Sequence, residues 1–255
     1  MSTTFLQATN EILRELNEVE LSASGFTSAV GIHRFAQDII NRAYLDIVNS
    51  EEEWPFLIEG SPEEPFSGSL YLETVIGTQW YTLKTGSTDT RTDFKSVDWE
   101  SFYLTDYGVA GATAPYSNEG LRFLSIEEYN LHLRDRDIES VTEAEAPYDE
   151  PMYVTHSSDN RYVGLSPIPD QVYRIYFNAW AAPTRLAANT DELVIPDRWM
   201  NVLYAKARYY MWQFKESPQQ ASFAMQEFVQ GLSQMRRNLI DPSPDDMFDD
   251  RIRVI

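Results

Sequence analysis

Cysteine is absent from the 255-residue sequence. Its absence excludes disulfides, thiolate zinc sites, iron–sulfur clusters and a cysteine nucleophile. Long apolar runs are absent too, since none approaches the ~20 residues that a membrane-spanning helix needs. The first residues have neither the basic nor the apolar region of a secretory signal. We therefore expect no membrane span and no signal peptide.

Positive charge is scarce as well. Lys and Arg number 20 against 40 Asp and Glu, which gives a formal net charge of -20. A uniformly acidic surface repels nucleic acid and so disfavours functions that grip phosphates or read a groove. Hydrophobic residues make up 43% of the chain and aromatic residues 13%, which is enough for a core and untypical of disorder. Composition thus indicates an acidic globular protein and selects no function.

Sequence signatures of catalysis are also missing. There is no glycine-rich phosphate loop, no paired-histidine metalloprotease helix and no nucleophile elbow. The three histidines fall in separate predicted elements and are His33, His132 and His156. The acidic residues cluster in segments 51–53, 139–150 and 245–250, whereas catalytic acids more often stand singly in apolar surroundings. We expect no enzyme, no cofactor and no metal.

The first sixty residues predict two helices. Thr4 and Gln7 have the spacing of a capping box, in which each side chain accepts a hydrogen bond from the other residue's backbone. Apolar residues then recur at helical spacing up to Leu16, and again over residues 32–48, where they cover a whole helix face. Glu53-Trp54-Pro55 ends this second helix, because the residue before proline disfavours helical backbone.

The C-terminal third predicts two more helices. Pro196 suits the first turn of one of them, whose apolar face runs from Trp199 to Phe214. Ser217 is the expected N-cap of the next, with Pro218 in its first position and Gln220 closing a capping box. Apolar residues at alternating steps of four and three predict a face packed along other helices and are Ala221, Met225, Phe228, Leu232, Met235 and Leu239.

The segment between these helices, from Gly68 to about Thr184, has the pattern of strands. Residues 70–75 and 80–83 flank Gly77-Thr78 and predict a hairpin, and residues 152–155 and 161–165 predict a second one. Further predicted elements are a strand over 94–104, a short helix over 126–136 and a strand over 173–180 with one buried face.

Each apolar helix face must be buried, so the economical fold packs all four helices together. The predicted fold class is therefore α+β, a four-helix bundle formed by N- and C-terminal helices with a β-rich insertion between them and an extended C-terminal arm. The expected domains are residues 1–60 and 191–241 for the bundle, 61–190 for the insertion and 242–255 for the arm.

The arm is too short to fold alone, and two interpretations of it stay open. A frayed terminus is one. The other is a docking arm whose apolar side chains occupy pockets of a partner, for example when the arm adds as a strand to a sheet of that partner. The candidate docking residues are Met247, Phe248, Arg251, Ile252, Arg253, Val254 and Ile255.

Aromatic residues of the predicted strands are a further candidate surface. They could form a sugar-stacking platform, although aromatics at period two more often form half-buried cross-strand pairs. The six residues are Tyr71, Trp80, Tyr81, Trp99, Tyr103 and Trp180.

At the level of ordered motifs, the chain resembles the head-to-tail adaptor proteins of tailed bacteriophages, the group that includes the tail tubular protein A type. The matching features are the first helix Ala8–Leu13, the run Leu16–Val19, Glu53–Phe56, Leu165–Asp170, Trp180–Pro183, Leu193–Trp199 and the aromatic helix 204–212. The resemblance covers both helical ends well and the middle loosely. The chain departs by carrying a longer insertion than the shortest members.

The resemblance implies a structural virion protein of the head–tail neck, assembled in the host cytoplasm. Twelve copies would form a ring beneath the portal protein, with the tail nozzle or tail-tube protein on the far side, and DNA would pass through without specific binding. The arm after Pro244 would reach back to the portal. We expect a monomer when free, because an apolar helix face can be buried within one subunit. The alternatives are a glycan-binding or glycan-cleaving tail component and a tail-tube terminator.

Overall fold

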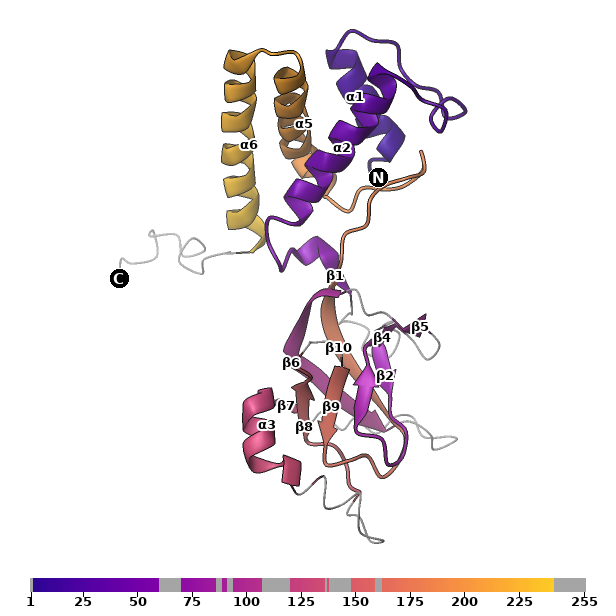
Figure 1. Ribbon diagram of the computed structural model, residues 1–255, viewed down its shortest axis with the longest axis vertical. Helices are drawn as coiled ribbons and strands as arrows, with labels where there is room; N and C mark the ends of the chain where they lie inside the picture. The colour runs from indigo at the N-terminus through magenta and orange to yellow at the C-terminus, as the bar shows by residue number, and fades with distance from the viewer. Residues whose placement is uncertain are drawn as a thin grey trace, which may run out of the picture. The chain divides into compact units, whose positions relative to one another are not determined.

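The computed structural model describes residues 2–59, 70–85, 89–90, 94–106, 120–135, 137, 148–158 and 162–240. Over these ranges the chain is a mixed α+β protein, which confirms the predicted class at that level (Figure 1). It divides into two compact units. We call them the helical unit, residues 1–57 with 183–255, and the β unit, residues 58–182.

The helical unit is built from helices at both ends of the chain. Its four long helices among the described residues are α1 (Phe5–Glu15), α2 (Ile32–Val48), α5 (Met200–Phe214) and α6 (Pro218–Leu239). Helix α5 is central, because it packs against α6 on one side and against α2 and α1 on the other (Figure 1). Ile40 of α2, Leu203 of α5 and Leu232 of α6 are among the buried side chains.

The predicted capping box of α1 is confirmed, whereas α2 ends at Val48 with Asn49 as its C-cap, ahead of the Glu53-Trp54-Pro55 that was expected to end it. Thr4 accepts a hydrogen bond from the backbone of Gln7, and the Gln7 side chain accepts one from the backbone of Thr4. After α2, Trp54 is fully buried and its indole N–H donates to the Ile47 carbonyl at 3.0 Å. A 3-10 turn over Pro55–Leu57 follows, so the chain leaves the helical unit at a fixed position.

Three details of the C-terminal helices differ from prediction. A 3-10 turn, Asp197–Trp199, precedes α5, which starts at Met200. Phe214 lies 62% exposed at the end of α5, with its ring 4.2 Å from that of Phe35, and so is not on the inner face. Ser217 is the N-cap of α6 and Pro218 its first residue, as predicted, but the capping box is wrong, because the Ser217 side chain makes no capping hydrogen bond in the described part of the chain.

The β unit contains two four-stranded sheets and a two-stranded one among its described residues. In the first sheet, β10 (Tyr173–Ala181) pairs antiparallel with β1 (Ile58–Glu59), β2 (Tyr71–Glu73) and β6 (Phe94–Asp106). In the second, the order is β3 (Trp80–Thr82), β9 (Tyr162–Ser166), β8 (Tyr153–His156) and β7 (Arg122–Phe123). The small sheet joins β4 (Lys84–Thr85) to β5 (Asp89–Thr90), and α3 (Ile126–His132) follows β7.

One hydrophobic core joins the two four-stranded sheets. Leu72, Phe102 and Phe177 of the first sheet belong to the same buried cluster as Val163 and Leu165 of the second. The predicted buried face of β10 is thereby confirmed, as is the second hairpin, in which β8 and β9 pair antiparallel.

The first predicted hairpin, around Gly77-Thr78, is wrong. β2 pairs with β10 and β3 pairs with β9, so the two segments lie in different sheets. The Tyr81 hydroxyl ties the crossing segment down, since it donates to the Val75 carbonyl at 3.0 Å and accepts from the Val75 N–H at 3.1 Å. Both segments bury alternate residues in one core, so their sequence pattern resembles that of a paired hairpin.

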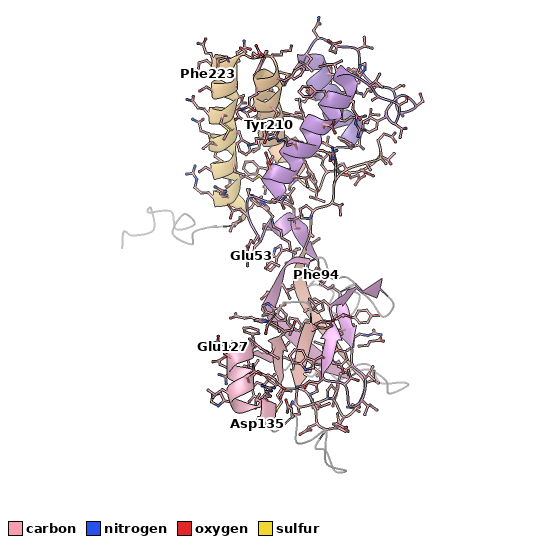
Figure 2. The ribbon with its side chains drawn as sticks, viewed as in Figure 1. Glu53, Phe94, Glu127, Asp135, Tyr210 and Phe223 are labelled. Carbon is pink, nitrogen blue, oxygen red and sulfur yellow. The ribbon has the colours of Figure 1, made fainter. Side chains whose placement is uncertain are left out.

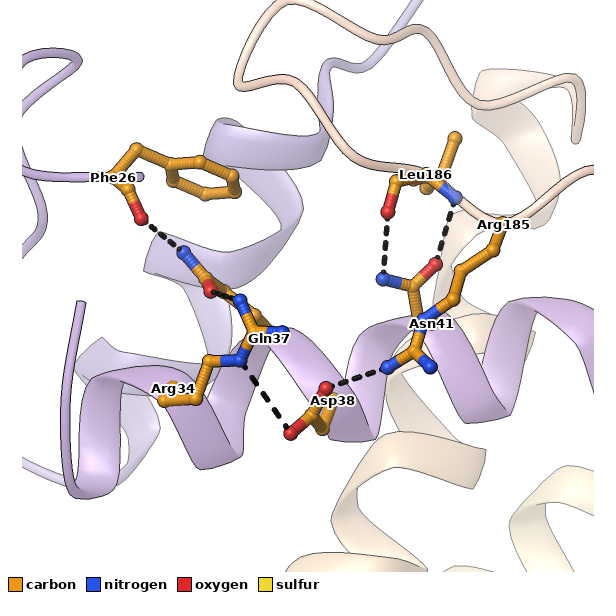
Figure 3. A network of polar contacts seen from close by, with 7 residues as sticks. All are labelled: Phe26, Arg34, Gln37, Asp38, Asn41, Arg185 and Leu186. Atoms are coloured by element: carbon orange, nitrogen blue, oxygen red, sulfur yellow. Dashed lines mark hydrogen bonds and ion pairs between the residues drawn. The ribbon is translucent and has the colours of Figure 1, made fainter. Parts of the chain in front are cut away.

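A buried amide fastens α2 to the chain that returns from the β unit. Asn41 is 4% exposed and makes two hydrogen bonds with the backbone of Leu186: Nδ2 donates to the carbonyl at 3.0 Å, and Oδ1 accepts from the N–H at 2.9 Å (Figure 3). One turn away, Asp38 and Arg185 form an ion pair of 2.6 Å between two exposed side chains. The two links join the same segments but differ in burial.

We expect Asn41→Ala to lower the free energy of unfolding by about 2–4 kcal/mol, because it leaves a buried N–H and a buried carbonyl without partners. Asp38→Asn is the matched control on the same helix, and its exposed ion pair predicts a loss below about 0.5 kcal/mol. Urea unfolding followed by circular dichroism measures both changes. Equal losses for the two variants would show that the amide does not fasten these segments.

Each unit also buries a tyrosine that resists ionisation. Burial raises the pKa of Tyr44 in α2 to about 12. Burial raises the pKa of Tyr81 in β3 to about 12 as well, although its hydrogen bond with Val75 acts in the opposite direction. The pKa of tyrosine is about 10 in an unfolded chain. Stability from these groups is therefore fully present below pH about 10 and is lost as the pH rises through about 12.

We expect alkaline unfolding over this pH range, detected as simultaneous loss of the far-ultraviolet circular dichroism signal and gain of phenolate absorbance. Tyr44→Phe removes one ionisable hydroxyl from the core and should move the midpoint to higher pH. Tyr162→Phe removes a side chain that is 43% exposed and should leave the midpoint unchanged. Identical midpoints for Tyr44→Phe and the unaltered chain would contradict this account.

Candidate functional site

Basic and acidic residues are distributed unequally among the helices of the helical unit. Residues 198–240, which contain α5 and α6, hold six basic and two acidic residues, although the whole chain is strongly acidic. Ion pairs connect several of these cations to the N-terminal helices and the turn after α2: Arg208 with Glu15 at 3.5 Å, Lys206 with Asp46 at 3.4 Å, and Arg236 with Glu51. Many of the basic side chains of α5 and α6 are thus directed inward, toward α1 and α2.

Burial shapes the electrostatics of this contact. It raises the pKa of Glu15, while Arg208 opposes the rise. Burial also raises the pKa of Tyr210 to about 12, and a hydrogen bond from the Tyr210 hydroxyl to the Asp46 carboxylate adds to that rise. Figure 2 shows Tyr210 on α5, on the side that faces α2. A neutral phenol and paired charges therefore fill the contact between the two helix pairs.

The other side of α5 and α6 carries an apolar groove of about 900 Å³ near the turn that joins them. The lining residues are Tyr209, Trp212, Gln213, Glu216, Ser217, Pro218, Ala221, Ser222, Met225, Gln226, Val229 and Gln230. Glu216 is the only one of these described side chains with a formal charge. We call this feature the α5–α6 groove. Large apolar concavities with uncharged polar rims are typical of surfaces that bind another protein.

Apolar side chains on α6 extend this surface. Phe223 is 61% exposed and Val229 is 52% exposed. Figure 2 shows Phe223 on the outer side of α6, away from α5. Helix α6 packs along α5, so its outer face has no helix of the same chain against it in the described structure. Val229 lines the α5–α6 groove, and Phe223 lies on a different side of α6.

Helices α5 and α6 approach each other closely at a glycine. A Cβ on Gly231 of α6 would lie 2.9 Å from Cγ2 of Val202 on α5, closer than real Cβ contacts. Val202 is buried and β-branched, so it has little freedom to turn away. Helical periodicity alone did not predict the role of Gly231; the available signal was a glycine inside a strong helical pattern, which indicates a packing constraint.

On the other side of the helical unit, the loop of residues 17–31 joins α1 to α2 (Figure 1). We call it the α1–α2 loop. Val19 and Val30 in this loop are each 77% exposed. The loop is held by α1, because the Asn10 side chain accepts from the Leu21 N–H at 2.8 Å and donates to the Leu21 carbonyl at 3.0 Å. Two large apolar side chains are thus exposed on a fixed backbone.

The structure does not bring the other predicted candidates together. The seven docking-arm residues, Met247 to Ile255, lie outside the described residues. His33 contacts the Val19 carbonyl, and the ring of His156 stacks on Phe123 in the β unit. No group of three or more His, Asp or Glu within the described ranges has metal-binding geometry. No helix found in the described part of the chain is both long and apolar enough to span a membrane.

The strand aromatics are mainly packing residues. Tyr71 and Tyr103 lie on either side of Tyr176 as cross-strand neighbours, with ring centroids 5.7 and 5.4 Å away. Tyr81 is buried in the core. Trp80 alone of the six lines a described pocket, a space of about 610 Å³ beside Tyr129. The arrangement gives cross-strand pairs rather than one continuous platform.

The comparisons with known proteins give one family. The profile of the family described as SU10 adaptor protein matches residues 3–250, which is nearly the whole chain. None of the curated proteins compared with the chain matches it.

We expect Gly231→Ala to lower the free energy of unfolding by about 1–3 kcal/mol through overpacking against Val202, even though alanine favours a helix by about 1 kcal/mol. Val202→Ala makes room for the added methyl, so Gly231→Ala should cost less in that background. A double-mutant cycle by urea unfolding measures the difference. Ser233→Ala, at an exposed position of α6, is the control for helix propensity. Equal costs in both backgrounds would contradict the proposed contact.

Proposed function

Because the chain belongs to the SU10 adaptor protein family, a family of phage structural adaptor proteins, we propose that it is the portal-to-tail adaptor of a virion. Copies of the chain form a ring on the portal protein, and the tail nozzle or tail-tube protein is added on the far side. Genomic DNA passes through the ring. The observation that carries this proposal is the family match over residues 3–250.

The helical unit supports a role in assembly. In the proposal, its four helices form the bundle that builds the body of the ring, and the β unit is an insertion that contacts other components of the neck. The α5–α6 groove is apolar and bears one formal charge among its described lining residues. A surface of this kind suits a protein partner and offers little to a polar small molecule.

The acidic composition suits a channel for DNA. Each chain carries a formal charge of -20, so a ring of copies concentrates negative charge around its axis. Phosphates are repelled by such a wall, and the duplex can slide without adhering to it. The proposed contact with DNA is therefore passive and independent of sequence.

The C-terminal arm, residues 242–255, is the proposed contact with the portal protein. Apolar side chains alternate with two arginines near its end, a pattern that suits pockets or a sheet edge on a partner protein. The proposed docking residues are Met247, Phe248, Arg251, Ile252, Arg253, Val254 and Ile255. The free protein is then a monomer, and the portal gathers the copies into a ring inside the host cytoplasm.

The test mixes the purified chain with the portal protein of the same phage and counts bound copies by native mass spectrometry. We expect saturation at about twelve copies for each portal ring, as a closed ring on a twelvefold platform requires. A chain truncated after Asp241 should fold, by circular dichroism, and fail to bind. Absence of binding by the full chain at micromolar concentration would contradict the adaptor role.

The same truncated chain separates the adaptor from a glycan-binding tail component. Trp80, beside Tyr129 in the 610 Å³ pocket, is the feature that favours this second candidate. A glycan-binding protein would show saturable changes in tryptophan fluorescence with host-surface oligosaccharides and would retain them after truncation. An adaptor loses portal binding instead. A tail-tube terminator would bind the tail tube and leave the portal unbound.

A further inference from the structure

We propose that, in the ring, the α1–α2 loop of one copy docks into the α5–α6 groove of the next copy. This inference rests on the proposed function, because it names the surfaces through which adjacent subunits meet. The occupant of the groove is thus a second copy of this chain. Val19 and Val30 supply the apolar contact, and Glu18 supplies a charge.

The two surfaces are complementary in their apolar character. Val19 and Val30 are each 77% exposed, which is unusual for side chains on a loop whose backbone is fixed by hydrogen bonds. The groove presents Trp212, Met225 and Val229 to solvent. Within the described part of the chain each surface is left uncovered, and joining them removes both sets of apolar atoms from water.

One charged side chain on each surface is available for a contact between copies. Glu18 is exposed next to Val19 and makes no ion pair within the described residues. Lys215 lies at the end of the groove, where its Nζ is 5.5 Å from the ring centroid of Trp212, and it has no carboxylate partner in the described part of the chain. Because Glu216 makes the groove lining itself acidic, the proposed ion pair is between Glu18 and Lys215, at the end of the groove.

The position of the two surfaces determines the kind of assembly. The α1–α2 loop and α6 lie on opposite sides of the helical unit (Figure 1). A loop cannot reach the groove of its own chain from there, and two copies cannot exchange the contact reciprocally. Contacts between two different surfaces are head-to-tail, and they generate rings when the rotation closes.

The contact has a small apolar area, so it is weak between free copies in solution. When the portal holds neighbouring copies in place, the same contact forms at a high effective concentration. This difference in effective concentration explains why the chain is a monomer in solution and part of a ring on the portal. The C-terminal arm and the loop contact thus have separate tasks, one recruiting copies and the other joining them.

The absence of cysteine makes a direct cross-linking test possible. Val19→Cys and Gln226→Cys are introduced together into the full chain, which is bound to the portal and treated with a short bifunctional maleimide. We expect a ladder of covalent oligomers. Each single variant should stay monomeric, and a mixture of the two single variants should stop at dimers. Val19→Cys with Leu131→Cys, an exposed position in the β unit, is the control for reactivity and should give no ladder.

A charge exchange tests the same contact without cross-linking. Glu18→Lys and Lys215→Glu should each lower the number of copies on the portal, and the double variant should restore it. If the portal binds its full complement of copies but the cysteine pair gives no ladder, or if a single variant dimerises with itself, this contact is wrong and the adaptor role stands. If no copies bind the portal, both proposals are wrong.

Discussion

The packing of α5 between α6 and the N-terminal helices is the constraint on which the rest of the helical unit depends. Helices from opposite ends of the chain are brought together across the whole β unit. Neither pair could bury its apolar face alone. The buried Trp54 and the Asn41 amide fix the two places where the chain leaves this contact and returns to it. The helical unit is consequently a long-range structure, completed only when residues 200–239 are present.

Electrostatics follow from this packing. Several cations of α5 and α6 pair with carboxylates of the N-terminal helices and the turn that follows α2, as Lys206 does with Asp46. The groove on the other side of α5 and α6 is lined mostly by glutamine, serine and apolar side chains, with Glu216 as its one charged residue among those described. An acidic chain would otherwise repel its own copies at close range. In the proposed ring, this groove is the place where two such chains approach.

Much of the fold could be predicted because helix periodicity and capping are local. The box at Thr4 and Gln7 needs only four residues, and it is confirmed. Strand pairing is not local, so the pattern around Gly77 predicted a hairpin where the chain passes between two sheets. The groove and the approach of Gly231 to Val202 were not predicted either, because both depend on how two helices face each other. Exposure of Val19 depends likewise on which residues a neighbouring helix leaves uncovered.

The pairing of Ile58 with Trp180 places the first and last strands of the β unit side by side. The ends of this long segment are therefore adjacent, and the helical unit is connected across it as if across a short hairpin. Once the β unit has folded, closing the helical unit costs little further chain entropy. The length and surface of the β unit can then change from one relative to another without disturbing the helices of the helical unit. We therefore expect relatives of this chain to differ more in the β unit than in the helical unit.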